Sequence, residues 1–142
     1  MADYGAFAEI NLSPATKELL QSLGDWTATA EFKTAKEKSW ETCSDKNREI
    51  VLEALLEQPE IKDKVADESS RRFIIRISGP IPGYFGSSQG PAYVYPLRIH
   101  PNTKPSISGI PLEVGRCIEI KSQVFTVTHG ADCLIILTVS AS

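Results

Sequence analysis

The side chains change type at about residue 70, and this change restricts the fold more than any other feature of the sequence. Residues 1–68 carry 15 acids and 8 bases, and their apolar residues recur largely at helical spacing. After residue 70, β-branched and aromatic residues dominate, as is typical of strands. Helices followed by strands favour an α+β fold, in which the helices pack on a mostly antiparallel sheet.

The length of the chain predicts a single domain. At 142 residues it is within the usual size of one domain and long enough to bury an ordinary core. We therefore expect one domain over 1–142, with an acidic helical part at 1–68 and a basic, β-rich part at 69–142, where 7 bases face 3 acids.

Two or three short helices are predicted in the acidic part. Ser13-Pro14 has the pattern of a helix cap followed by proline at the first helical position, and Gly24 is a typical stop, so the first helix covers about 14–23. A second helix is predicted to start near Ser44-Asp45, and a third to start at Pro59. Between the first and second helices, the alternation of Trp26–Phe32 fits a strand, but the Lys/Glu-rich run Lys33–Lys38 equally fits an extension of a helix through Trp40.

Five or six strands are predicted after residue 70. Those that the pattern defines are 72–77, 92–99, 112–120, 123–129 and 132–139. Pro96 lacks a backbone N–H, so we expect strand 92–99 to lie at an edge or to contain a bulge. Two-residue turns at Lys121-Ser122 and Gly130-Ala131 would join the last three strands into a C-terminal three-strand meander.

The predicted meander would determine which side chains share a face of the sheet. It would align Ile118, Phe125 and Ile136 on one face, place Cys117 and Cys133 on the other, and set His129 opposite Asp132. The last two strands are apolar on both sides, so both sheet faces need a cover. We expect the helices to cover one face, and a partner subunit or the long loops to cover the other.

A stretch without acids marks the candidate binding surface. No Asp or Glu occurs between Glu68 and Glu113, and this stretch includes two Pro/Gly-rich loops, 79–91 and 100–111. Arginine with tyrosine or phenylalanine is typical of single-stranded nucleic-acid grooves and of protein interfaces. The predicted binding residues are Arg72, Arg76, Tyr84, Phe85, Tyr93, Tyr95, Arg98, His100 and Lys104.

These features predict a non-enzymatic binding or assembly protein that associates with itself, for example a matrix-like or capsid-like structural subunit of a virus. The alternative is a protein that binds single-stranded nucleic acid such as RNA, and an enzyme is the third possibility. In a further interpretation, the acidic helices simply neutralise the basic residues within the molecule.

The sequence indicates no catalytic, cofactor or metal site. Three cysteines without close spacing predict unbridged thiols rather than disulfides or a zinc site. Cys133 would point away from His129, so the predicted His129–Asp132 pair stabilises a turn and activates no nucleophile. Loop 79–91 lacks the Gly-Lys-Ser/Thr ending of a phosphate-binding loop. Without an apolar segment of membrane-spanning length or a signal peptide, we expect a cytoplasmic location.

Overall fold

The structure of the protein is a computed structural model that describes residues 7–34, 40–65, 71–77, 83–86, 92–107, 109–121 and 124–137. Its helices are α1 (Pro14–Thr27), α2 (Arg48–Leu56) and α3 (Pro59–Val65). The strands are β1 (Phe7–Asn11), β2 (Phe32–Thr34), β3 (Glu41–Cys43), β4 (Arg71–Ile77), β5 (Gly83–Gly86), β6 (Ala92–Ile99), β7 (Ser106–Ile107), β8 (Ile110–Pro111), β9 (Arg116–Ile120), β10 (Val124–Val127) and β11 (Ala131–Leu137).

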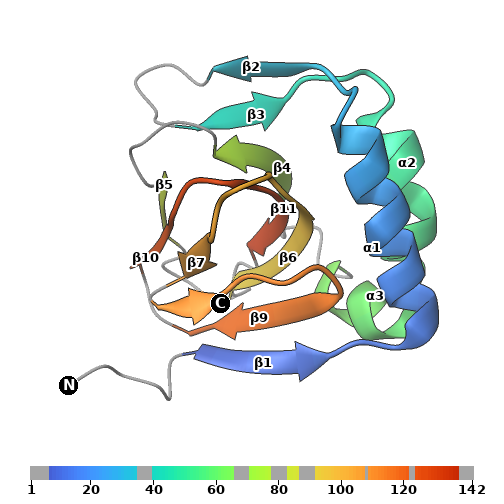
Figure 1. The fold of residues 1–142 in the computed structure, drawn as a ribbon. Coiled ribbons are helices and arrows are strands. Elements are labelled where there is room, and N and C mark those ends of the chain that lie inside the picture. The colour runs from blue at the N-terminus through green and yellow to red at the C-terminus, as the bar shows by residue number, and fades with distance from the viewer. Residues whose placement is uncertain are drawn as a thin grey trace.

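The strands form two antiparallel sheets, and the predicted α+β class is confirmed. The large sheet has seven strands in the order β1-β9-β6-β11-β4-β3-β2, and the small sheet has four in the order β5-β10-β7-β8. The prediction of one sheet with five or six strands was therefore too simple. Helices lie on one side of the large sheet and the small sheet lies on the other (Figure 1).

A core fills the space on each side of the large sheet. On the helical side, Leu20 and Leu52 pack against sheet residues such as Ile74 and Leu134. On the other side, Ile107 and Val127 of the small sheet pack against the opposite face of the large sheet. Both faces are covered, as the two-sided apolar strands predicted. The second cover is this small sheet rather than a partner subunit, and β5, β7 and β8 come from the two segments predicted to be long loops, so the loop alternative is correct in part.

Helix α1 begins as predicted and ends later. The Ser13 hydroxyl accepts a hydrogen bond from the Thr16 N–H, and Pro14 occupies the first turn. Gly24 does not end the helix, which continues to Thr27. A Cβ at Gly24 would lie 1.9 Å from the Leu97 carbonyl oxygen, so the glycine permits α1 to lie directly on β6.

The starts of α2 and α3, and the segment between α1 and α2, agree only in part with the prediction. Helix α2 begins three residues after the predicted Asp45, whose carboxylate instead accepts the Asn47 N–H at 2.9 Å. Helix α3 begins at Pro59 as predicted. In the ambiguous segment, Trp26 and Thr27 still belong to α1, so the strand expected to start at Trp26 is wrong there. Phe32–Thr34 is a strand paired with β3, so the helical alternative is wrong for Lys33 and Thr34. Residues 35–39 lie outside the described residues. Strand β1 was not predicted, and β5, β7 and β8 lie in the segments 79–91 and 100–111 that were predicted to be loops.

Strand β6 explains the effect of Pro96. It lies between β9 and β11, so the predicted edge position is wrong, but the predicted bulge is confirmed. The pairing of β6 with β11 shifts between Asp132 and Cys133, where Pro96 is the partner of Cys133 and Arg98 is the partner of Asp132. On its other side, the pairing with β9 runs only from Ala92 to Val94. Pro96 therefore lies beyond the end of the pairing with β9 and at the irregularity in the pairing with β11, so its missing N–H interrupts no regular ladder.

The predicted C-terminal meander is wrong. Strand β9 pairs with β1 and β6, β10 pairs with β5 and β7 of the small sheet, and β11 lies between β4 and β6. Gly130, with φ of 114°, does not close a hairpin. Its N–H bonds the Ile77 carbonyl and its own carbonyl accepts the His100 N–H, so it joins strands of the large sheet. Ser122 and the side chain of Phe125 lie outside the described residues.

Candidate functional site

A buried carboxylate organises the charges near the start of β11, the central strand of the large sheet. Asp132, on β11, is fully buried. Arg76, on β4, donates from Nε to Oδ1 at 2.9 Å and from Nη2 to Oδ2 at 3.2 Å. The same Nη2 donates to the Thr27 carbonyl at 2.6 Å, and the guanidinium lies 4.0 Å from the centre of the Phe32 ring. Arg76 thus joins β11 to the end of α1 and to β2.

Two more residues reach the same carboxylate from β6 and the segment that follows it. Arg98 donates from Nε to Oδ2 of Asp132 at 3.1 Å, and His100 Nε2 lies 2.9 Å from Oδ1. Burial alone would raise the pKa of Asp132, but hydrogen bonds from Arg76, His100 and Arg98 lower it below its ordinary value. We call Asp132, Arg76, Arg98 and His100 the Asp132 cluster.

The Asp132 cluster replaces a predicted contact. His129 was expected to face Asp132 across a turn, but it is exposed, and His100 occupies that position. The reason is that β10 and β11 are not partners, so no hairpin aligns the two residues. Asp132 is the single charged residue among 131–139, an otherwise apolar strand, and this pattern indicates a buried acid that must pair with positively charged side chains. Only the pairing of β11 with β4 and β6 shows that Arg76 and Arg98 are these positively charged partners.

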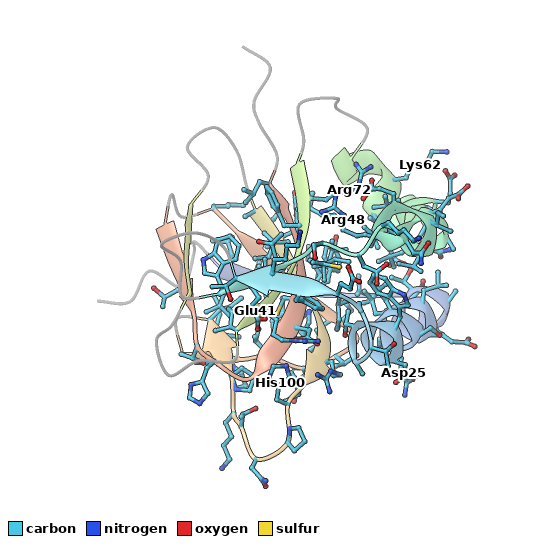
Figure 2. The ribbon with its side chains drawn as sticks, turned by 90° about the horizontal axis from the view of Figure 1, so that it is seen from above. Asp25, Glu41, Arg48, Lys62, Arg72 and His100 are labelled. Atoms are coloured by element: carbon cyan, nitrogen blue, oxygen red, sulfur yellow. The ribbon has the colours of Figure 1, made fainter. Side chains whose placement is uncertain are left out.

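Arg72 is also paired within the molecule. Its Nη2 donates to the Glu49 carboxylate of α2 at 2.6 Å, and Arg48 contacts the other oxygen of that carboxylate at 3.1 Å. Figure 2 shows Arg48 and Arg72 close together where α2 meets the large sheet, away from His100. This pair is what the intramolecular interpretation expects, because an acidic helix neutralises an arginine of the sheet.

The predicted aromatic residues do not form one surface. Tyr93 and Tyr95 are buried in the core on the helical side, and burial raises the pKa of the Tyr93 hydroxyl, which donates to Glu119, to about 12. Lys104 is exposed. The side chains of Tyr84 and Phe85 lie outside the described residues, as does most of loop 79–91. The structure therefore brings together Arg76, Arg98 and His100, and it places Arg72, Tyr93, Tyr95 and Lys104 elsewhere.

The cysteines lie inside the protein as buried thiols. Cys117 belongs to the core on the helical side and Cys133 to the core on the other side, so the prediction that they share a face is wrong. Burial raises the pKa of the Cys43 and Cys133 thiols. A raised pKa keeps a thiol protonated and unreactive.

An apolar hollow, missed by the sequence prediction, lies between α1 and α2. It measures about 210 Å³ and is lined by Leu19, Ser22, Leu23, Trp26, Val51 and Leu55. Leu19, Trp26 and Val51 are only partly buried, and neighbouring Ile50 is 68% exposed. We call these residues together the helical surface. In the sequence, Ile50 could have indicated this surface, because it is an apolar residue of α2 outside the helix face that packs against the core.

A wider groove runs along the other side of α1. It measures about 720 Å³ and lies between α1, the end of β6 and the turn at Val114-Gly115. Lys17 and Arg98 line it together with Glu18 and Asp25, so its charges are mixed. Within the described residues, no group of three His, Cys, Asp or Glu side chains could hold a metal ion.

Comparison with known proteins adds no relative. The chain matches no protein-family model, no curated protein and no solved structure. No helix in the described part of the chain has the length and apolar character needed to cross a membrane.

Proposed function

We propose that this protein is a non-enzymatic protein-binding module and that the helical surface makes the contact. The observations that carry the proposal are the apolar hollow between α1 and α2 and the 68% exposure of Ile50, which directly precedes Val51 of the hollow on α2. Isolated exposed apolar residues are common, but Leu19, Trp26 and Val51 around the hollow are all partly exposed, and such a group of apolar residues is typical of interaction sites. Val114, the other large apolar side chain found exposed among the described residues, is 38% exposed and lies away from this hollow.

The chemistry of the buried groups supports a binding role over catalysis. The Asp132 carboxylate already accepts hydrogen bonds from two arginines and lies beside His100, so it is not available as a base. Cys43 and Cys133 are buried thiols with raised pKa values, which disfavours them as nucleophiles.

The stretch without acids, with its two loops 79–91 and 100–111 and the arginines beside them, is a competing contact surface. Arg72, Arg76 and Arg98 already form ion pairs within the protein, which leaves less positive charge for a ligand than the sequence predicted. Self-association through these loops is tested by measuring the solution mass over a range of protein concentrations. The RNA-binding alternative is tested with a single-stranded oligonucleotide, whose affinity should fall steeply with salt.

Selection from a library of random displayed peptides tests the proposed function. Peptides selected on the parent protein should lose at least about tenfold in affinity for Ile50→Ser, which corresponds to about 1.4 kcal/mol. Val114→Ser is the matched control, because it removes an exposed apolar side chain elsewhere, and it should not change the affinity. If the selected peptides bind Ile50→Ser as tightly as the parent, the helical surface is not the contact surface.

A further inference from the structure

Strands β6 and β9 separate part-way along their length. Their pairing runs only from Ala92 to Val94, whereas β6 continues to Ile99. Strand β9 keeps its pairing with β1 as far as Arg116, so the separation leaves one side of β6 without a partner strand. Pro96 lies in this part of β6, and its missing N–H favours such a break in the ladder.

The wider groove beside α1 opens where the two strands separate. One wall is the unpaired end of β6, residues 97–99, and another is the turn at Val114-Gly115 that precedes β9. The third wall is α1, from residue 14 to residue 25. The volume of about 720 Å³ lies within the range of about 300–1,000 Å³ that is usual for binding sites.

Ile99 presents its backbone groups to this groove. The N–H of the next residue, His100, donates to the Gly130 carbonyl at 2.7 Å, on the β11 side of β6. Successive residues of a strand present their N–H and C=O groups to opposite edges, so those of Ile99 point away from β11 and toward the groove. Apart from the pairing with β11, Ile99 makes no backbone hydrogen bond among the described residues. An unpaired strand edge of this kind is a template for pairing with another chain.

The groove carries charges of both signs that do not neutralise one another. They are Lys17, Glu18 and Asp25, which are exposed on α1, and Arg98 on β6. In the part of the chain that the structure describes, no ion pair joins any two of these four side chains, and Arg98 pairs through Nε with Asp132. Two acids offset the attraction of two bases for a nucleic acid or an anionic membrane, so a ligand with charges of both signs fits the groove better.

We infer that an extended peptide segment of another protein occupies this groove and pairs with the free edge of β6 as an added antiparallel strand. The peptide residue opposite Ile99 exchanges two backbone hydrogen bonds with it. Acidic side chains of the peptide face the two bases of the groove, and its basic side chains face the two acids. A helix is a poor occupant, because its backbone groups are bonded internally and would leave Ile99 unpaired. This is a second contact surface, and it does not rest on the helical surface of the proposed function.

Peptide selection followed by amide hydrogen exchange tests the inference. A library of short displayed peptides is selected on Ile50→Ser, so that peptides of the helical surface are not recovered. The selected peptides, synthesised with both ends capped, should carry acidic and basic residues together. In the free protein the Ile99 N–H should exchange with solvent faster than the bonded His100 N–H, and a saturating peptide should slow the exchange at Ile99 by at least about tenfold.

N-methylation of the peptide tests whether it binds as a strand. In an antiparallel pair, only every second residue of the peptide directs its N–H toward β6. Methylating the amides of that set should weaken binding by at least about tenfold, because hydrogen bonds to β6 are lost. Methylating the alternate set should leave the affinity nearly unchanged, since the side chains are the same. Equal effects of the two sets would overturn strand addition.

Charge variants of α1 test the wall of the groove. Glu18→Gln combined with Asp25→Asn should weaken the peptide several-fold, as should Lys17→Gln, and each should change the dependence of its affinity on salt. The three side chains are exposed, so the fold should be kept. Glu53→Gln and Lys46→Gln are the matched controls, because both residues are exposed and neither lines the groove, and they should change nothing.

The results separate this inference from the proposed function. If peptides selected on the parent depend on Ile50 but none selected on Ile50→Ser protects the Ile99 N–H, the groove inference is overturned and the helical surface stands. The reverse result supports the groove and removes the helical surface. Unchanged affinity for both charge variants would also overturn the inference, because the occupant would not be a peptide of mixed charge. A protein mass that rises with concentration, together with protection of the Ile99 N–H, would make a second copy the occupant instead.

Discussion

Arg76 holds both carboxylate oxygens of Asp132, at 2.9 Å from Nε and 3.2 Å from Nη2, and the carboxylate is fully buried. The two residues are register partners on β4 and β11. Because the Arg76 guanidinium also contacts the Thr27 carbonyl and the Phe32 ring, this ion pair joins the middle of the large sheet to the end of α1 and to β2.

Asp132→Asn should destabilise the protein strongly. Removing one partner of a buried ion pair costs about 3–5 kcal/mol, since the remaining charge is left without compensation. Arg76→Gln should cost more than Arg98→Gln, because Arg98 makes a single bond to the carboxylate and is about one-third exposed. Urea unfolding of the three variants tests this order. Equal stability of Asp132→Asn and the parent would show that the cluster contributes nothing to the fold.

The Asp132 cluster also predicts a dependence of stability on pH. The pKa of Asp132 is lowered in the folded protein, so its ionised form is favoured by folding. This stabilisation is present above the ordinary carboxyl pKa of about 3.9 and is lost as the pH falls from there through the lower folded pKa. Thermal unfolding between about pH 2 and pH 7 should show this loss in the parent. In Asp132→Asn, the part of the loss that comes from this group should disappear.

Gly24→Ala should destabilise the protein although alanine is the better helix former. In an exposed helix this change would stabilise by about 1 kcal/mol. Here the new Cβ would lie 1.9 Å from the Leu97 carbonyl oxygen, so α1 must move away from β6 at a cost of roughly 1–3 kcal/mol or more. Gln21→Ala, at an exposed position on the same helix, is the control and should leave the melting temperature nearly unchanged. A more stable Gly24→Ala variant would disprove the close contact.

Glu60 should contribute to the start of α1 although it belongs to α3. Its carboxylate accepts from the Ser13 N–H at 3.0 Å and from the Ser13 hydroxyl at 2.6 Å, and the Thr16 hydroxyl also donates to it. Ser13→Ala should cost about 1 kcal/mol, as for other caps. Since the residues share one network, Ser13→Ala and Glu60→Gln should cost less together than the sum of their separate effects. Additive losses of unfolding free energy would show two independent contacts.

The three cysteines should titrate as thiols, and only after unfolding. Each is at most 3% exposed in the native protein, so a thiol reagent should react slowly until denaturant is added and should then detect three thiols without reduction. Cys117 and Cys133 lie on opposite faces of the large sheet, and four strand spacings, about 19 Å, separate the strands of Cys43 and Cys117. Such positions cannot be bridged. Detecting one thiol would mean that two of them are linked.

The sequence by itself determined where some of the elements lie and which side chains share a face on some of the strands. Ser13-Pro14 and Pro59 marked helix starts, because capping and the fixed φ of proline are local effects. Alternation separated Tyr93 and Tyr95 from Val94, since side chains along a strand point to opposite faces. Pro96 marked the bulge because it lacks the N–H that a regular strand uses.

Only the tertiary structure decided which strands are neighbours and therefore which charges meet. Alternation says which side chains share a face of one strand, but it does not say which strand pairs with which. For this reason the predicted meander, the His129–Asp132 pair and the shared face of Cys117 and Cys133 were wrong. Once β11 lies between β4 and β6, Arg76 and Arg98 become register partners of Asp132, and residues 34 and 56 positions apart form one cluster.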